Sequence, residues 1–261
     1  MTFEEFADAL ATNRRRAAGC QLVVVSSVGS TNDLARRILE ATTQEGQQVV
    51  PPVLVVAWQQ TAGRGRRERR WESPAGKGVY ASLGIVLERS SSPGSLPLLV
   101  GVGMCRALNR FLPSASPCRL KWPNDLLVGA KKLGGILVEC RSVRPAEVGA
   151  VIGWGVNCRH GPDDLPQEGT SLERETESSP SLAAVAWSTA SGVLEELKHL
   201  GDLPYAVREY LAHTVHEEGE RIRCRTGSEV LEGIFRGLDE SGRLRLEIDG
   251  DIRKVSSGEV S

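Results

Sequence analysis

The apolar residues of the chain form two kinds of pattern, which predict strands and helices in turn. Short apolar, β-branched or alternating runs predict strands at 22–25, 52–58, 78–87 and 148–156. Apolar residues at helical spacing predict helices at 2–10, 34–39, 96–112, 182–200 and 203–213. The polar stretch at 161–180 is expected to be an exposed loop.

From about residue 220 the pattern changes to short alternating strands alone. They are expected at 221–225, 229–238, 243–248 and 251–255. A segment of this length is too short for a large core of its own. We therefore predict a small β-barrel-like domain, residues 217–261, docked on a main domain formed by residues 1–216.

The composition excludes several classes of protein. The 261 residues carry a formal net charge of −1, so the cationic surplus of a dedicated polyanion binder is absent. The start of the chain lacks the features of a signal peptide, and no apolar run is long enough to span a bilayer. We therefore expect a cytoplasmic protein without a membrane partner. Six cysteines without Cys-x-x-Cys spacing favour free thiols over disulfides or structural zinc.

Residues 60–71 form a loop that carries five arginines between a predicted strand and a tryptophan. Gly63 and Gly65 can adopt positive φ and let the backbone approach a ligand closely. Guanidinium groups offer forked donors for phosphate or carboxylate oxygens, so the loop suits an anionic ligand. A solvated basic turn and a contact with nucleic-acid phosphates explain the same residues. Glu68 stands where the dinucleotide-binding fingerprint has its third glycine, so that motif is absent.

Polar groups also gather at the ends of other predicted strands. Ser30 and Thr31 precede a helix, where a hydroxyl is a good N-cap, and capping alone explains them. The predicted hairpin at 119–139 contains Lys121, Asp125 and Lys132, and charged residues rarely enter such apolar surroundings unless they are paired or bind a ligand. A hairpin with solvated lysines is the alternative.

Taken in order, these motifs resemble those of the biotin protein ligases. The resemblance rests on the motifs Gly29-Ser30-Thr31-Asn32, Gln60-x-x-Gly63-Arg64-Gly65-Arg66-x-x-Arg69-x-Trp71, Lys121-Trp122-Pro123-Asn124-Asp125, Lys132-Leu133-x-Gly135-Ile136-Leu137 and Gly155-Val156-Asn157. Residues 257–261 resemble the end of that family's C-terminal domain, so the resemblance extends from about residue 26 to residue 261. Any one motif could arise by chance, but all of them in this order and spacing displace the solvated-turn alternatives.

The resemblance implies an α+β fold. Its main part would be a mixed central sheet flanked by helices, the class II synthetase-like fold of biotin and lipoate ligases, followed by an SH3-like β-barrel. It also implies that the carboxylate of biotin attacks the α-phosphorus of ATP to give biotinyl-AMP, and that a lysine of an acceptor protein then takes the biotinyl group. Such chemistry needs preorganised cations, Mg²⁺ on the phosphates without direct protein ligands, and a loop that excludes water.

The site residues of the family carry over by motif. The implied biotin-binding set is Ser30, Thr31, Asn32, Gln60, Arg64, Gly65, Arg66, Lys132 and Gly135. The implied nucleotide-binding set is Arg66, Arg69, Trp71, Lys121, Asn124 and Asn157. The implied catalytic set is Arg66, Lys121, Asp125 and Lys132, with Asp125 orienting the acceptor lysine or accepting its proton.

Two departures from the family pattern limit what carries over. Glu68 occupies a position where the family usually has glycine, which puts the ordering of the loop and the retention of biotinyl-AMP in doubt. Only about twenty residues precede the first core strand, too few for the winged-helix DNA-binding domain of some members. The sequence therefore predicts a ligase with no DNA partner and no repressor function.

The resemblance also implies the partner of the enzyme, the biotin carboxyl carrier domain of a biotin-dependent carboxylase. Some members dimerise through the main sheet, so a monomer and a homodimer are both open. A lipoate ligase of the same fold is the nearest rival function, and the arginine-rich loop with Lys121-Trp122-Pro123-Asn124-Asp125 favours biotin. A non-catalytic nucleic-acid-binding protein is disfavoured by the near-neutral charge and by the lack of aromatic residues along a basic face.

Overall fold

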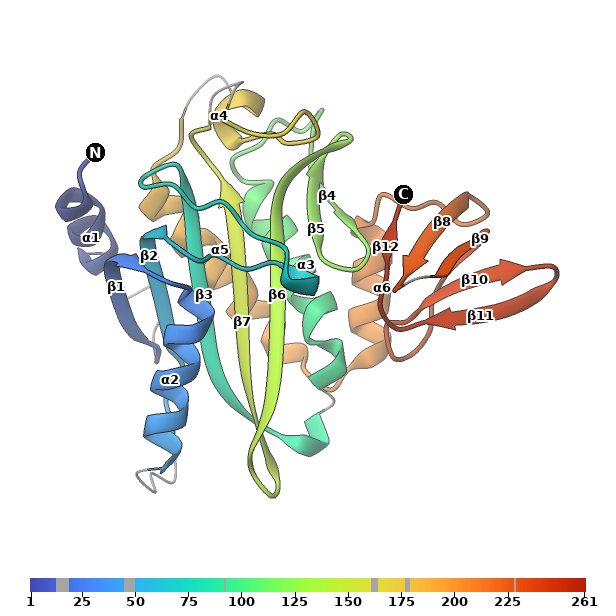
Figure 1. Cartoon of the computed structure of the whole chain (residues 1–261), viewed down its shortest axis with the longest axis horizontal. Coiled ribbons are helices and arrows are strands. Elements are labelled where there is room, and N and C mark those ends of the chain that lie inside the picture. The colour runs from blue at the N-terminus through green and yellow to red at the C-terminus, as the bar shows by residue number, and fades with distance from the viewer. Residues whose placement is uncertain (13–18, 45–49, 92, 161–163, 177–178, 228) are drawn as a thin grey trace.

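A mixed β-sheet forms the main part of the molecule. The computed structural model describes residues 1–12, 19–44, 50–91, 93–160, 164–176, 179–227 and 229–261. The sheet has seven strands in the order β1-β2-β3-β7-β6-β5-β4 (Figure 1). They are β1 (Gln21–Val28), β2 (Val53–Gln60), β3 (Gly78–Glu88), β4 (Cys118–Lys121), β5 (Asp125–Val128), β6 (Lys131–Arg144) and β7 (Glu147–Asn157). β1 and β2 are parallel and the other neighbouring pairs are antiparallel, so the predicted mixed sheet is confirmed.

Helices cover both faces of this sheet, as Figure 1 shows. α2 (Thr31–Gln44) packs on one face, and the other face carries α1 (Phe3–Thr12), α3 (Leu96–Leu108), α5 (Leu182–Glu196) and α6 (Leu203–His213). The residues of β2 pack alternately on the two faces of the sheet. Leu54 and Val56 belong to the large core on one face, whereas Val53 and Val55 pack with Ala35 of α2 on the other. Successive side chains of a strand face opposite sides, so a continuous apolar run is buried on both.

Two predicted helices are shorter than their apolar patterns. The helix expected at 96–112 ends at Leu108, and the one expected at 182–200 ends at Glu196 and continues as a 3₁₀ turn, Leu197–His199. The segment expected to be a loop at 161–180 contains the single helical turn α4 (Leu172–Glu175), while 161–163 and 177–178 lie outside the described residues. A four-residue helix has no period that a sequence pattern can show.

The C-terminal segment folds as a separate antiparallel sheet. Its strands are β8 (Arg221–Thr226), β9 (Glu229–Leu238), β10 (Leu244–Ile248), β11 (Asp251–Val255) and β12 (Glu259–Val260), in the order β11-β10-β9-β8-β12. Among the described residues, β11 and β12 lie at its two edges, so strand pairing does not close the predicted barrel. Trp122 of the main part donates to the carbonyl of Gly242 at 3.2 Å, which ties the two sheets together.

Candidate active site

One cleft of about 360 Å³ lies between the start of α2, the arginine-rich loop, the strands β6 and β7, and the final strand β12. All the site residues predicted from the sequence line it, namely Ser30, Thr31, Asn32, Gln60, Arg64, Gly65, Arg66, Arg69, Trp71, Lys121, Asn124, Asp125, Lys132, Gly135 and Asn157. They come from segments far apart in the chain, so the fold brings them together.

One end of the cleft is polar and uncharged. Ser30, Thr31 and Asn32 are buried there at the start of α2. The backbone N–H of Thr31 donates to Gln60 Oε1 at 2.8 Å, and Gln60 Nε2 donates to Ser73 Oγ at 2.8 Å. Donors and acceptors fixed in this way suit a small polar ligand.

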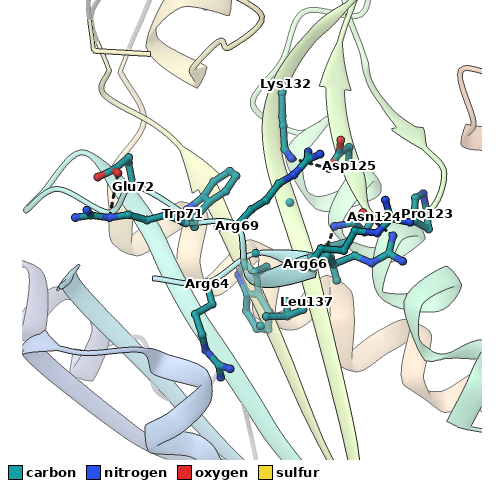
Figure 2. A pocket seen from close by; sticks show the side chains of 18 of the residues that line it. Arg64, Arg66, Arg69, Trp71, Glu72, Pro123, Asn124, Asp125, Lys132 and Leu137 are labelled. Atoms are coloured by element: carbon teal, nitrogen blue, oxygen red, sulfur yellow. Dashed lines mark hydrogen bonds and ion pairs between the residues drawn. The ribbon is translucent and has the colours of Figure 1, made fainter. Parts of the chain in front are cut away.

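The other end of the cleft is cationic. Lys132 Nζ lies 2.6 Å from Asp125 Oδ1 and 5.5 Å from the centroid of the Trp71 ring (Figure 2). Lys121 lines the same cleft, and its ammonium group makes no hydrogen bond or ion pair within the described ranges. A phosphate or carboxylate entering here would meet one ammonium group that is paired and one that is not.

The arginine-rich loop contacts the C-terminal sheet. Arg66 donates to Asn124 Oδ1 at 3.3 Å and to the carbonyl of Gly258 at 3.4 Å. Arg69 donates through both terminal nitrogens to Glu259, at 2.6 and 2.8 Å. Burial lowers the pKa of the Arg66 guanidinium, and the hydrogen bond from Arg69 lowers the pKa of the Glu259 carboxyl. Both contacts hold the loop across the mouth of the cleft.

Arg64 differs from the other arginines, because its side chain points away from Arg66 and Lys132 (Figure 2). Its guanidinium pairs with Asp33 at 2.8 Å and with Glu139 at 3.2 Å. These ion pairs tie the start of the loop to α2 and β6. In this structure the guanidinium of Arg64 therefore anchors the arginine-rich loop through these two carboxylates.

Trp71 lies against the backbone of β7. A Cβ atom built at Gly155 would lie 2.3 Å from Trp71 Nε1, so only glycine leaves room for the indole. At Gly135, which pairs with Gly155 across β6 and β7, the added Cβ would lie 3.6 Å from both Trp71 and Lys132, an ordinary contact. Trp71 Nε1 is buried without a hydrogen-bond partner among the described residues. The packing of Trp71 thus explains why the Gly155-Val156-Asn157 motif begins with glycine.

A wall of the cleft comes from residues 165–169, which the sequence assigned to an exposed loop. The backbone N–H of Lys132 donates to the carbonyl of Glu168 at 2.6 Å, and the N–H of Thr170 donates to the carbonyl of Lys132 at 2.9 Å. Asn157 Nδ2 donates to the carbonyl of Thr170 at 3.0 Å. The predicted exposed loop is confirmed for Pro166, Gln167 and Glu168, which are exposed, and is wrong for residues 169–172, which are buried next to the start of β6.

Sequence reasoning also missed the glycine at 153 and the C-terminal residues of the cleft, Gly258, Glu259 and Val260. Gly153 and Gly155 lie two apart on β7 and therefore on one face, a signal that was available. The two-residue strand β12 gave no such signal. No group of three or more His, Cys, Asp or Glu side chains that could hold a metal ion occurs among the residues described.

Comparison with known families identifies the fold. A sequence model for the Biotin/lipoate A/B protein ligase family matches residues 26–157, and one for the biotin protein ligase C terminal domain matches residues 219–261. The chain belongs to the biotin/lipoate A/B protein ligase family. It is an enzyme of the ligase class, of the biotin protein ligase type.

Several known ligases of the family resemble this chain along most of its length. It is 33% identical to the bifunctional ligase/repressor BirA of Escherichia coli, over 93% of this chain and 74% of the relative. It is 32% identical to the biotin–[acetyl-CoA-carboxylase] ligase of Mycobacterium tuberculosis, over 92% of this chain and 88% of that protein. The structure of the Aquifex aeolicus biotin protein ligase in complex with biotin and ATP matches with a TM-score of 0.73 and 26% identity, over 92% and 97% of the two chains.

No helix in the described part of the ligase is both long and apolar enough to cross a membrane.

Proposed function

We propose that this ligase activates biotin with ATP as biotinyl-AMP and then transfers biotin to a lysine of a biotin carboxyl carrier domain. The observation that carries the proposal is the cleft itself, which joins an uncharged hydrogen-bonding end to a cationic end formed by Arg66, Lys121 and Lys132. The biotin and ATP bound to the Aquifex aeolicus relative support both substrates, and the name of the Mycobacterium tuberculosis relative supports a carboxylase acceptor. The C-terminal match to biotin protein ligases favours biotin over lipoate.

The first step must bring two anions together. A carboxylate oxygen of biotin forms a bond to the α-phosphorus of ATP, and pyrophosphate leaves with the electrons of the broken P–O bond. Arg66, Lys121 and Lys132 would offset the charge that gathers at the α-phosphate, which is the main contribution a preorganised site can make. Mg²⁺ would be carried by the phosphates of ATP.

The second step is attack by the acceptor lysine on the mixed anhydride. The amine nitrogen forms a bond to the acyl carbon, AMP leaves with the electrons of the acyl–oxygen bond, and the amine loses a proton. Asp125 lines the cleft 2.6 Å from Lys132, so it can orient the incoming ammonium group or accept its proton. The arginine-rich loop would keep water from the anhydride meanwhile.

The contacts of the loop support different roles for its two central arginines. The guanidinium of Arg66 lies beside Asn124 at the cleft and is the better phosphate ligand. The guanidinium of Arg64 would have to leave both Asp33 and Glu139 to do the same. We therefore assign phosphate binding to Arg66 and loop closure to Arg64.

The proposal is tested by incubating the protein with labelled biotin, ATP and Mg²⁺, with and without a biotin carboxyl carrier domain. We expect pyrophosphate release that depends on biotin, and label on the carrier. A carrier whose acceptor lysine is replaced by arginine is the control for transfer, and lipoate in place of biotin is the control for the substrate. The proposal is wrong if the protein consumes no ATP when biotin is supplied.

Gly155→Ala is expected to raise the KM for ATP about tenfold, because the added Cβ collides with Trp71 and moves it from the nucleotide side of the cleft. Steady-state kinetics at saturating biotin measure the change. Gly135→Ala is the matched comparison and should have a smaller effect, because its Cβ meets only ordinary contacts. An equal effect of both substitutions would contradict the seating of Trp71 on Gly155.

Glu68→Gly is expected to slow the release of biotinyl-AMP, because glycine is the usual residue of the family here and gives the loop more conformational freedom to close. Glu68 ends a 3₁₀ turn, Arg66–Glu68, in which Arg67 already has a positive φ of 54°. Release is measured by chasing the preformed labelled intermediate with unlabelled biotin and ATP. A faster off-rate in the variant would show that Glu68 does not weaken retention.

A further inference from the structure

Ser82 lies directly beneath the polar end of the cleft without lining it. It belongs to β3 and is wholly buried. Its Oγ lies 2.7 Å from Thr31 Oγ1 and 2.6 Å from Asn32 Oδ1, and both of these residues do line the cleft. A hydroxyl has one hydrogen to give, so the question is which neighbour receives it.

The neighbours of Asn32 answer that question. Asn32 Nδ2 lies 2.8 Å from a carboxylate oxygen of Glu139, and an ionised carboxylate can only accept. The amide nitrogen of Asn32 must therefore face Glu139, which turns Oδ1 toward Ser82. A carbonyl oxygen cannot donate, so Ser82 gives its only hydrogen to Asn32. It has none left for Thr31.

The orientation of Gln60 is fixed in the same way. The backbone N–H of Thr31 only donates, so Gln60 Oε1 faces it, and Gln60 Nε2 donates to Ser73. The hydroxyl hydrogen of Thr31 then has two acceptors inside the protein, Gln60 Oε1 at 3.0 Å and Ser82 Oγ at 2.7 Å. In either arrangement the hydrogen stays within the protein, and Thr31 Oγ1 keeps a lone pair for the cleft.

The hydroxyl of Ser30 is in the opposite situation. Ser30 is buried beside Thr31 and lines the cleft, and in the described ranges no protein group bonds to its side chain. Its hydrogen is therefore available to a ligand. The polar end therefore offers an acceptor at Thr31 beside a donor at Ser30. A ligand with an N–H next to a C=O can bond to both, its N–H to Thr31 and its C=O to Ser30.

We propose that Ser82 is a positioning residue for the specificity of the cleft. By donating to Asn32 and lying 2.7 Å from Thr31 Oγ1, it holds the Thr31 hydroxyl in place as an acceptor for an N–H of the ureido ring of biotin, while Ser30 donates to the ring carbonyl. The inference rests on the proposed function, since it takes biotin as the ligand whose ureido ring bonds to Thr31 and Ser30. It adds a buried residue outside the cleft to those that decide which ligand is bound.

The test is the affinity of Ser82→Ala for biotin. Removing the Ser82 hydroxyl leaves Asn32 Oδ1 unsatisfied and takes away the neighbour of Thr31 Oγ1, so both side chains lose a fixed position and we expect the Kd for biotin to rise about tenfold. The kcat at saturating biotin and the KM for ATP should stay within about twofold. Ser188→Ala is the matched control, because Ser188 lies on α5 and bonds to the carbonyl of Ala107 away from the cleft. Its Kd should equal that of the wild type.

Ser82→Cys separates positioning from packing. Cysteine is somewhat larger than serine but keeps a weak donor, so its Kd should lie between those of the wild type and Ser82→Ala. Should Ser82→Ala fail to fold, Glu139→Gln replaces it: glutamine can also donate, so Asn32 can turn. Because Glu139 also pairs with Arg64, Asp33→Asn is its control, and the Kd for biotin should rise several-fold more in Glu139→Gln than in Asp33→Asn.

Three outcomes would overturn the inference. The first is an unchanged Kd for biotin in folded Ser82→Ala. The second is a Kd for biotin and a KM for ATP that rise together with a lower melting temperature, which indicates general damage. The third is a Ser82→Cys variant no better than Ser82→Ala. Failure of the wild type to bind biotin would instead overturn the proposed function itself.

Discussion

Lys132→Ala is expected to lower the rate of biotinyl-AMP formation by about 100- to 1,000-fold, the usual loss when a preorganised group that stabilises developing charge is removed. Lys132 is held by Asp125 at 2.6 Å and lies over the ring of Trp71, so its ammonium group is in place before any ligand arrives. Single-turnover assays with labelled biotin and ATP measure the rate of the chemical step without the transfer step.

The neighbouring lysine provides the control for this substitution. Lys131 precedes Lys132 on β6 and is exposed, and adjacent strand residues face opposite sides of a sheet. Lys131→Ala removes the same charge from the same strand and should leave the rate within about twofold. A near-normal yield of adenylate from Lys132→Ala would refute the role of this lysine.

Arg66→Gly is expected to leave adenylation measurable but to release biotinyl-AMP at least about tenfold faster. The guanidinium of Arg66 joins the loop to Asn124 and to the carbonyl of Gly258, and hydrogen bonds of charged groups are the stronger ones lost on substitution. Released intermediate acylates exposed lysines, so labelling of an unrelated bystander protein measures the leak.

Arg70→Gly is the matched control within the same loop. Arg70 is exposed, and in the part of the chain that the structure describes its side chain pairs only with Glu72, itself exposed, so this pair contributes little to holding the loop. The control should label bystander lysines no more than the wild type does. Equal labelling by the wild type and Arg66→Gly would show that Arg66 does not retain the intermediate.

The regular elements were predictable because local pattern determines them. The β-branched run at 52–58 became β2, and the alternation at 78–87 buried Val79, Ala81, Leu83 and Ile85 on one face of β3. The central hypothesis required Arg66, Lys132 and Asn157 to surround one cavity, and all three line the same cleft. That hypothesis depended on the order and spacing of the five motifs that resemble those of biotin protein ligases.

The parts that failed depend on partners distant in sequence. Residues 168–170 lie in a stretch predicted to be solvated, yet the backbone of Lys132 bonds to Glu168 and Thr170, and the side chain of Asn157 donates to the carbonyl of Thr170. The side chain of Arg64 points toward Asp33 and Glu139 because it pairs with both. No local sequence pattern indicates that these two residues lie beside the arginine-rich loop. The acceptor lone pair of Thr31 follows from a chain of hydrogen bonds that only coordinates can reveal.

The contacts between the arginine-rich loop and the C-terminal sheet also set how that sheet can change. Arg66 and Arg67 donate to main-chain carbonyls, those of Gly258 and Arg225. The side chain of Arg225 can change without loss of its carbonyl, whereas a Cβ at Gly258 would collide with Cys224 Sγ. Arg225 pairs with Glu259 in the register of β8 with β12. Over evolutionary time β8 and β12 can therefore replace side chains other than that of Glu259, which pairs with Arg69, whereas an insertion or deletion of one residue in either strand would shift both carbonyls and release the loop.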